Sequence, residues 1–77
     1  MSRITDLAPG NRAHLLHIGG ERSFRRRLME LGLLPGTPVR LVRSTGIGDL
    51  LEVEVRGCYL SLRRSDAAEL RVVPLST

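Results

Sequence analysis

Cysteine and aromatic residues are nearly absent from this chain. Cys58 is the single cysteine, so no internal disulfide can form and stability must come from packing. Phe24 and Tyr59 are the only aromatic residues, so there is no row of rings on which successive nucleic-acid bases could stack. We therefore expect no nucleic-acid partner, although a basic module that binds nucleic acid stays open as an alternative.

Long hydrophobic runs are also missing. No window approaches the roughly 20 apolar residues that a membrane-spanning helix requires, and the first residues hold no apolar run of signal-peptide length. We therefore expect a cytoplasmic protein that does not span a membrane. With 77 residues, 42% of them hydrophobic, the chain should form a single domain over residues 1–77 with a small core.

Acidic residues are fewer than basic ones. Twelve basic residues, all of them arginine, and eight acidic residues give a net charge of +4. This balance suits an acidic protein face, anionic lipid or nucleic acid, and composition does not choose among them. The basic residues are densest at Arg25, Arg26 and Arg27, inside the only segment with a convincing helical pattern.

This segment predicts a helix that begins after Ser23 and ends at Gly32. The Ser23 hydroxyl can cap the first turn, and Gly32 can adopt the left-handed conformation that stops a helix. Phe24, Leu28 and Leu31 fall at i, i+4 and i+7, an apolar stripe that should cover the neighbouring sheet. The arginine triplet would then lie at the positive end of the helix dipole, at a cost of ~0.3–1 kcal/mol per cation. We expect another group or a partner to offset that cost.

The rest of the chain predicts β-structure. Strands are expected at 12–18, 39–43, 51–55, 58–62 and 70–73, with a single helical turn at 66–68 that Ser65 caps. Proline and glycine predict type II turns at 8–11 and 34–37.

Residues 51–55 alternate strictly between apolar and charged side chains, which predicts a strand with one buried face. A two-residue turn at Arg56 and Gly57 would pair Val55 with Cys58, and so place all apolar residues of this hairpin on one face. Five short strands and one helix in so small a domain favour a closed or nearly closed barrel.

Potential metal ligands are few. His14 and His17 lie three residues apart in a predicted strand, so they should point to opposite faces and cannot chelate one metal together. Cys58 is expected on the core face as a small buried apolar group. These three are weak candidates for binding Fe2+ or Zn2+, and we expect no required cofactor. Since no catalytic dyad emerges, we also expect that the protein is not an enzyme.

The order of four segments resembles a known family. LAPG at 7–10, RLMELGLLPGT at 27–37, GDLLEVEVRG at 48–57 and LRRSDA at 62–67 are together similar to the ferrous iron transport protein A (FeoA) family. The resemblance implies a small SH3-like five-stranded barrel with one short helix inserted after the first strand. It also implies a cytosolic accessory of bacterial Fe2+ uptake that acts with the membrane GTPase transporter FeoB. The loop at 45–50 lacks the two prolines that family members often carry there.

The leading hypothesis is a non-enzymatic protein-interaction module that binds or regulates the cytosolic GTPase domain of FeoB. An SH3-like groove binds partners through apolar pockets flanked by charge. The expected partner-binding residues lie beside the helix and on the 45–50 loop, namely Arg25, Arg26, Met29, Leu33, Ile47 and Asp49. The alternatives are a regulatory module that dimerises through a divalent metal, and the nucleic-acid-binding barrel.

Overall fold

The computed structural model of this protein describes residues 2–45 and 49–75. Within those residues one antiparallel sheet has six strands in the order β1-β6-β2-β3-β4-β5. The strands are β1 (Ser2–Arg3), β2 (Arg12–Ile18), β3 (Pro38–Ser44), β4 (Leu50–Val55), β5 (Cys58–Arg63) and β6 (Leu70–Pro74). The helices are the 3-10 helix η1 (Ile4–Asp6), α1 (Arg22–Glu30) and the short α2 (Arg64–Ala67). None of these helices is long and apolar enough to cross a membrane.

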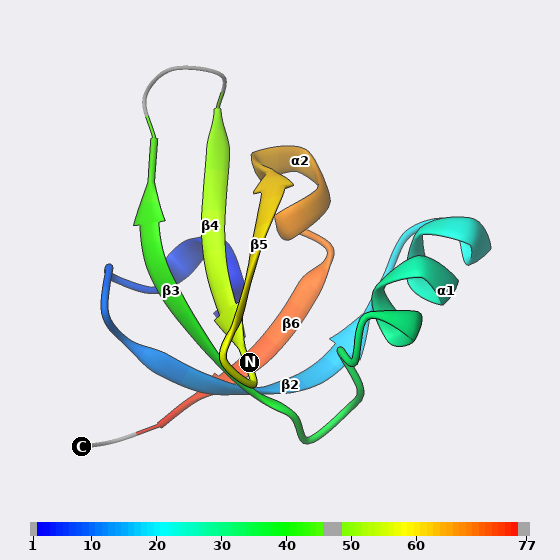
Figure 1. The fold of residues 1–77 in the computed structure, drawn as a ribbon, viewed down its shortest axis with the longest axis horizontal. Helices are drawn as coiled ribbons and strands as arrows, with labels where there is room; N and C mark the ends of the chain where they lie inside the picture. Colours follow the sequence, from blue (N-terminus) through cyan, green and yellow to red (C-terminus); the bar gives the residue numbers. More distant parts are fainter. Residues whose placement is uncertain (1, 46–48, 76–77) are drawn as a thin grey trace.

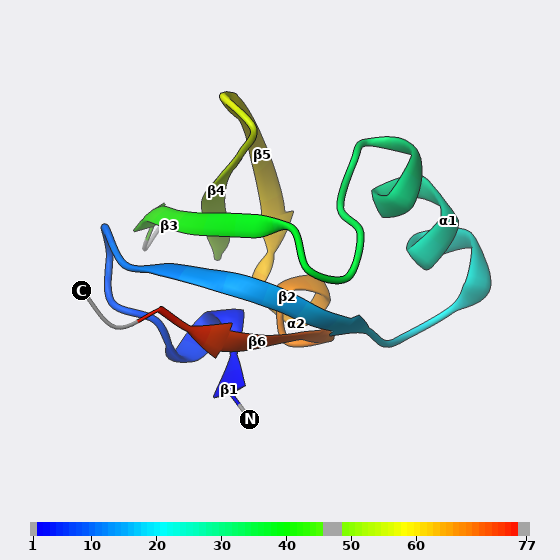
Figure 2. The same ribbon diagram turned by 90° about the horizontal axis from the view of Figure 1, so that it is seen from below.

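The sheet curls around its inner face, and α1 lies beyond one end of β2 (Figures 1 and 2). The mainly β fold that the sequence predicted is therefore confirmed, with a sixth, two-residue strand that was not expected. Its two outermost strands, β1 and β5, are not hydrogen-bonded to each other in the part of the chain that the structure describes. The barrel is consequently open along one seam.

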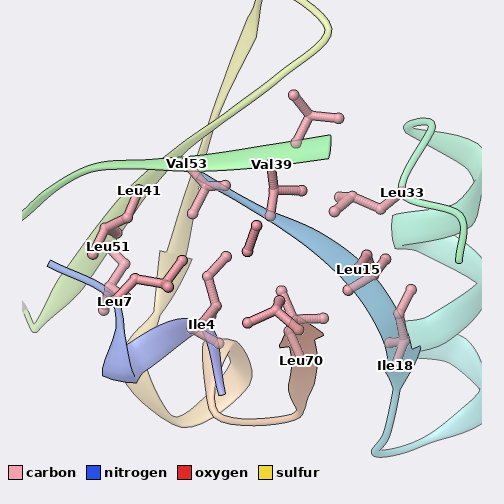
Figure 3. Packing of buried hydrophobic residues seen from close by; sticks show 14 of the residues in the cluster. Ile4, Leu7, Leu15, Ile18, Leu33, Val39, Leu41, Leu51, Val53 and Leu70 are labelled. Atoms are coloured by element: carbon pink, nitrogen blue, oxygen red, sulfur yellow. The ribbon is translucent and has the colours of Figure 1, made fainter. Parts of the chain in front are cut away.

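Inward-facing aliphatic side chains from β2, β3, β4 and β6 meet in the core, where they are joined by residues of the helices and connecting turns (Figure 3). Burial of each leucine or valine side chain stabilises the fold by roughly 1.5–3 kcal/mol. The buried residues are Ile4, Leu7, Ala13, Leu15, Ile18, Leu28, Leu33, Val39, Leu41, Leu51, Val53, Val55, Ala67, Leu70 and Val72.

The β4–β5 hairpin has the predicted register. Val55 pairs with Cys58, and the pairing continues in step to the ends of both strands. Arg56 and Gly57 have φ values of 53° and 82°, the left-handed pair of a type I′ turn. The prediction that Cys58 is buried is wrong, because it lies on the edge strand directly after the turn, and its side chain is exposed.

A bulge interrupts β2. The pairing with β6 shifts between Leu15 and His17, so Leu16 has no partner of its own in that ladder. Around the bulge, His14, Leu16 and His17 are consequently exposed, whereas Leu15 and Ile18 are buried. The prediction that the two histidines point to opposite faces is therefore wrong, because the extra residue resets the alternation of the strand.

Helix α1 begins two residues earlier than predicted, at Arg22 instead of Phe24, and ends as predicted. Its N-cap is Glu21 and not the predicted Ser23, which lies inside the first turn. The Glu21 side chain makes no capping hydrogen bond. Gly32 has a φ of 100° and donates its N–H to the carbonyl of Met29 at 3.0 Å. The N–H of Leu33 donates to the carbonyl of Leu28, also at 3.0 Å, which completes a Schellman motif.

This motif changes which leucine covers the core. Leu28 is buried and Phe24 packs partly against the core, but Leu31 is 56% exposed, so its predicted place in the covering stripe is wrong. Because the chain reverses at Gly32, Leu33 turns inward instead and is fully buried. Its side chain points from the segment after α1 toward Val39 (Figure 3).

The helix boundaries also change the electrostatic account of the arginine triplet. Since α1 begins at Arg22, this arginine and not the triplet occupies the unfavourable first turn. Arg27 lies in the last turn, where the negative end of the helix dipole stabilises a cation. Dipole repulsion therefore does not explain the need for a partner at the triplet, as the sequence had suggested.

The remaining predictions concern short elements. Both predicted type II turns are present, with Asn11 N–H donating to the Ala8 carbonyl at 3.0 Å and Thr37 N–H donating to the Leu34 carbonyl at 2.9 Å. The single helical turn is present as α2, but Arg63 and not Ser65 is its N-cap.

Candidate protein-binding groove

A groove of about 400 Å³ lies between α1, the end of β2 and the turn that follows α1. We call it the α1 groove. Helix α1 extends beyond the end of β2, which leaves the outer side of the helix uncovered by the sheet (Figure 2). The lining residues are His17, Ile18, Arg22, Arg25, Arg26, Met29 and Pro35.

The helical part of the α1 groove follows from spacing. Arg22, Arg25, Arg26 and Met29 are at i, i+3, i+4 and i+7, so they share one face of the helix. Leu28, on a different side of α1, is buried in the core. The helix therefore presents three cations and one flexible apolar side chain on its outer face.

The other walls depend on backbone geometry. The bulge in β2 turns His17 outward at the end of the strand that meets α1. The turn at 34–37 is tied down because Gly36 N–H donates to the Leu15 carbonyl at 2.6 Å and Leu34 N–H donates to Thr37 Oγ1 at 3.1 Å. These bonds hold Pro35 against the groove.

Charge and apolar surface are combined in the α1 groove. Among the described residues, arginines pair with carboxylates elsewhere, and neither Arg22, Arg25 nor Arg26 has a carboxylate within 4 Å. Met29 is 45% exposed between them. Cations beside a methionine suit an acidic protein surface with an apolar centre, since charge steers the encounter and apolar contact supplies affinity.

The structure brings together only part of the predicted partner-binding set. Arg25, Arg26 and Met29 line the α1 groove. Leu33 is fully buried and presents no side chain to a partner. Asp49 lies away from α1, where its Oδ1 accepts a hydrogen bond from Nε of Arg64 at 2.9 Å. Ile47 lies outside the described residues.

Four groove residues were not predicted as partner-binding residues: Ile18, Arg22, Pro35 and His17, the last considered only as a metal ligand. Arg22 could have been found from its helical spacing to Arg25 and Arg26. It was missed because the predicted helix began only after Ser23 and therefore excluded it. His17 could not be found from an alternating pattern, because the bulge breaks that pattern.

The acidic residues of β4 are paired across the sheet. Nε of Arg40 donates to Oε1 of Glu54 at 2.6 Å, and this hydrogen bond raises the pKa of Arg40 above its ordinary value. Arg43 lies 3.6 Å from Glu52 in a looser pair. Within residues 2–45 and 49–75, no three histidine, cysteine or carboxylate side chains gather closely enough to hold a metal ion.

The fold and the groove define the class of this protein as a small open β-barrel with a cationic groove beside its helix. The chain belongs to the FeoA domain family, whose model matches residues 3–74. This family is involved in Fe2+ transport, and the family expected from the sequence is thereby confirmed.

Two solved structures show the likeness in detail. FeoA from Chlorobium tepidum is 35% identical, with a TM-score of 0.91, and the match covers 97% of this chain and 71% of that chain. FeoA from Stenotrophomonas maltophilia, solved with zinc, is 28% identical with a TM-score of 0.77 over 94% of this chain and 89% of that chain. The latter is described as an SH3 domain protein, which confirms the expected fold class.

A third relative joins two functions in one polypeptide. The FeoA/FeoB fusion protein of Porphyromonas gingivalis is 29% identical over 75 residues, which are 97% of this chain. The matched part is only 9% of the fusion protein, so this chain corresponds to a small part of it.

Proposed function

We propose that this protein is a cytoplasmic, non-enzymatic accessory of Fe2+ uptake that binds the cytosolic GTPase domain of FeoB through the α1 groove. The observation that carries this proposal is the Porphyromonas gingivalis fusion, in which a segment similar to nearly all of this chain is joined to the transporter FeoB. Two activities that share one polypeptide there act in the same process, and physical association is the simplest link between them.

A fusion and a separate accessory reach association by different means. A covalent linker holds two domains at an effective concentration of about millimolar, so weak contacts suffice. A separate chain has no such help and must supply affinity from its own surface. The α1 groove offers the required combination, with cations that speed encounter and Met29 as an apolar contact.

The direct test is a titration of this protein with the FeoB cytosolic domain from the same organism. Reversing two groove charges with Arg25→Glu and Arg26→Glu should weaken binding at least about tenfold, because two cations that face the partner become repulsive. The matched control reverses the charges of Arg12 and Arg56 with Arg12→Glu and Arg56→Glu. Both side chains are exposed away from the α1 groove. That variant has the same net charge and should bind within about twofold of the unmodified protein.

Two results would contradict the proposal. Equal losses in both double variants would mean that only net charge matters, and no binding in any nucleotide or iron state would remove FeoB as the partner. Met29→Ala tests the apolar contribution to binding separately from the charge contribution, because it removes contact area without changing charge. We expect it to raise the dissociation rate more than it lowers the association rate.

A second candidate function is the pairing of two chains through a divalent metal. It is favoured by the bulge in β2, which puts His14 and His17 on the same exposed side, and by the zinc complex of the Stenotrophomonas relative. Imidazole is a good ligand for Zn2+ and Fe2+, but the described part of one chain gathers no third ligand. Ligands from a second copy would have to complete the site.

This candidate makes its own prediction. Anaerobic Fe2+ or Zn2+ should convert monomers to dimers in sedimentation velocity, and His14→Ala with His17→Ala should abolish the conversion. Cys58→Ser, a change at the other exposed candidate ligand, tests whether the thiol takes part. A monomer at saturating metal, with the histidines unmodified, would exclude metal-mediated pairing.

A further inference from the structure

Strand β5 forms an outer edge of the sheet, with β4 as its only hydrogen-bonded neighbour among the described residues. The Arg64 N–H donates to the Asp49 carbonyl at 3.0 Å, which fixes the alternation of the antiparallel ladder. By that alternation, the backbone groups of Cys58, Leu60 and Leu62 face β4. Those of Tyr59, Ser61 and Arg63 face outward, where another strand can pair with them.

An apolar groove runs beside this edge. It measures about 310 Å³ and lies between β5 and α1, and we call it the β5 groove. Leu60 and Leu62 are only half-buried on its β5 side, and Leu31, 56% exposed, lies on its α1 side. A strand added to β5 would place every second side chain over these leucines.

The charges around the β5 groove indicate which kind of molecule can bind there. Arg27 and Arg63 line it, and neither has a carboxylate within 4 Å among the described residues, whereas Asp66 is the only acidic residue in the lining. The nearest acidic residues of β4, Glu52 and Glu54, are already paired with arginines of β3. The edge is therefore cationic, which favours an acidic segment and disfavours a second copy of a chain with net charge +4.

We propose that the β5 edge accepts an extended segment of a partner protein in which acidic and aliphatic residues alternate, added as a further strand of the sheet. Its aliphatic side chains enter the β5 groove, and its acidic side chains lie beside Arg63 and Arg27. This surface is distinct from the α1 groove, and the inference does not depend on FeoB being the partner.

The test uses a synthetic capped heptapeptide in which four glutamates alternate with three leucines, added to isotopically labelled protein. We expect amide resonances of Tyr59, Ser61 and Arg63 to shift most, and their hydrogen exchange to slow. A peptide of the same composition with all glutamates before all leucines should bind at least tenfold more weakly. Replacing the glutamates by lysines should abolish binding.

Backbone pairing is tested without changing the protein. N-methylation of alternate peptide amides gives two peptides, one blocked on the edge that faces β5 and one blocked on the other edge. We expect one of them to lose at least tenfold in affinity and the other to bind normally. Equal binding by both would overturn strand addition, because a docked peptide without backbone pairing is insensitive to which edge is blocked.

Protein variants test the charge and the edge. Arg63→Glu should weaken binding at least fivefold, and Arg12→Glu, with the same change in charge on a distant strand end, should not. Ser61→Pro removes one outward N–H and should reduce binding, whereas Ser61→Ala should not, provided that both spectra remain folded.

Two further outcomes would also overturn the inference. Shifts centred on Arg22 and Arg25 would place the peptide in the α1 groove, and concentration-dependent broadening of β5 amides without peptide would make a second copy the occupant. Failure of this test leaves the FeoB titration unaffected, because that titration depends on Arg25 and Arg26.

Discussion

Leu33 stabilises this protein although it lies outside every helix and strand. It is fully buried, and the Schellman motif at the end of α1 holds its backbone in place. Leu33→Ala should lower the free energy of unfolding by about 2–5 kcal/mol, because it leaves a cavity between α1 and the sheet. Urea denaturation measures this loss.

The matched control is Leu31→Ala, two residues earlier. Its side chain is 56% exposed, so the substitution should change stability by no more than about 0.5 kcal/mol. A small loss at both positions would mean that Leu33 does not support the core. Because Leu33 was expected from the sequence to bind a partner, any effect of its substitution on binding has to be corrected for unfolding.

Arg22 is expected to oppose stability while supporting binding. It occupies the first turn of α1, where the helix dipole disfavours a cation, and it lines the α1 groove. Arg22→Gln should raise the free energy of unfolding by about 0.3–1 kcal/mol and weaken FeoB binding. Arg27→Gln, in the last turn, should lower stability by a similar amount. If the free energy of unfolding changes in the same direction in both variants, the helix dipole does not explain the effect of either arginine.

Single residues show where sequence reasoning succeeds at the site. Arg25, Arg26 and Met29 could be predicted because charge density and helical spacing are visible in the sequence. Leu33 was misplaced, because its burial depends on a chain reversal whose direction no periodic pattern reveals. Arg22 was missed, because the helix begins without a side-chain cap.

At the scale of elements, α1 is only weakly anchored to the rest of the fold. Only Leu28 of its nine residues is fully buried, and no side chain caps its first turn. We expect α1 amides to exchange hydrogen faster than those of β3 and β4, by a factor of roughly ten or more. Hydrogen exchange measured by NMR checks this, and bound FeoB domain should slow α1 selectively. Equal protection in α1 and β3 would contradict the expectation.

The β4–β5 hairpin contains a correctable strain. Arg56 has a φ of 53°, a left-handed conformation that costs a residue with a Cβ atom about 1–2 kcal/mol. Asn tolerates this conformation better, so Arg56→Asn should raise the free energy of unfolding by roughly 0.5–1 kcal/mol. Arg56→Val should lower it instead, because a β-branched side chain fits poorly there. A higher melting temperature for Arg56→Val than for Arg56→Asn in thermal unfolding would contradict this expectation.

Most elements could be predicted because their patterns are local. The β4–β5 register follows from strict alternation on either side of a two-residue turn, and β2 was placed with its observed bounds. β1 escaped detection, because two residues carry no periodicity and pair only through the late strand β6. The bulge also escaped detection, because it breaks the strict alternation on which the strand prediction depends.

At the scale of the whole molecule, little surface is available for binding. A standard interface takes about 800 Å² from each partner, which is roughly a sixth of the 5020 Å² exposed by this protein. Because the net charge is +4, long-range attraction should speed encounter with an acidic partner.

Association with the FeoB domain should therefore depend on salt. We expect the association rate constant to fall about tenfold between 50 and 500 mM sodium chloride, with a smaller change in the dissociation rate constant. Stopped-flow fluorescence measures both constants, and sucrose at matched viscosity controls for slower diffusion. An association rate that does not respond to salt would contradict an electrostatic role for the arginines.

The bulge in β2 has a consequence for the reach of α1. A regular strand would turn Ile18 outward, and the extra residue returns it to the core before the chain leaves the sheet. Deleting Leu16 would keep each inward side chain inward but shorten the path to the helix by about 3.3 Å. One extra residue in β2 is therefore a spacer between the sheet and α1, and its removal should bring the helix nearer to the strand while His17 stays outward and Ile18 inward.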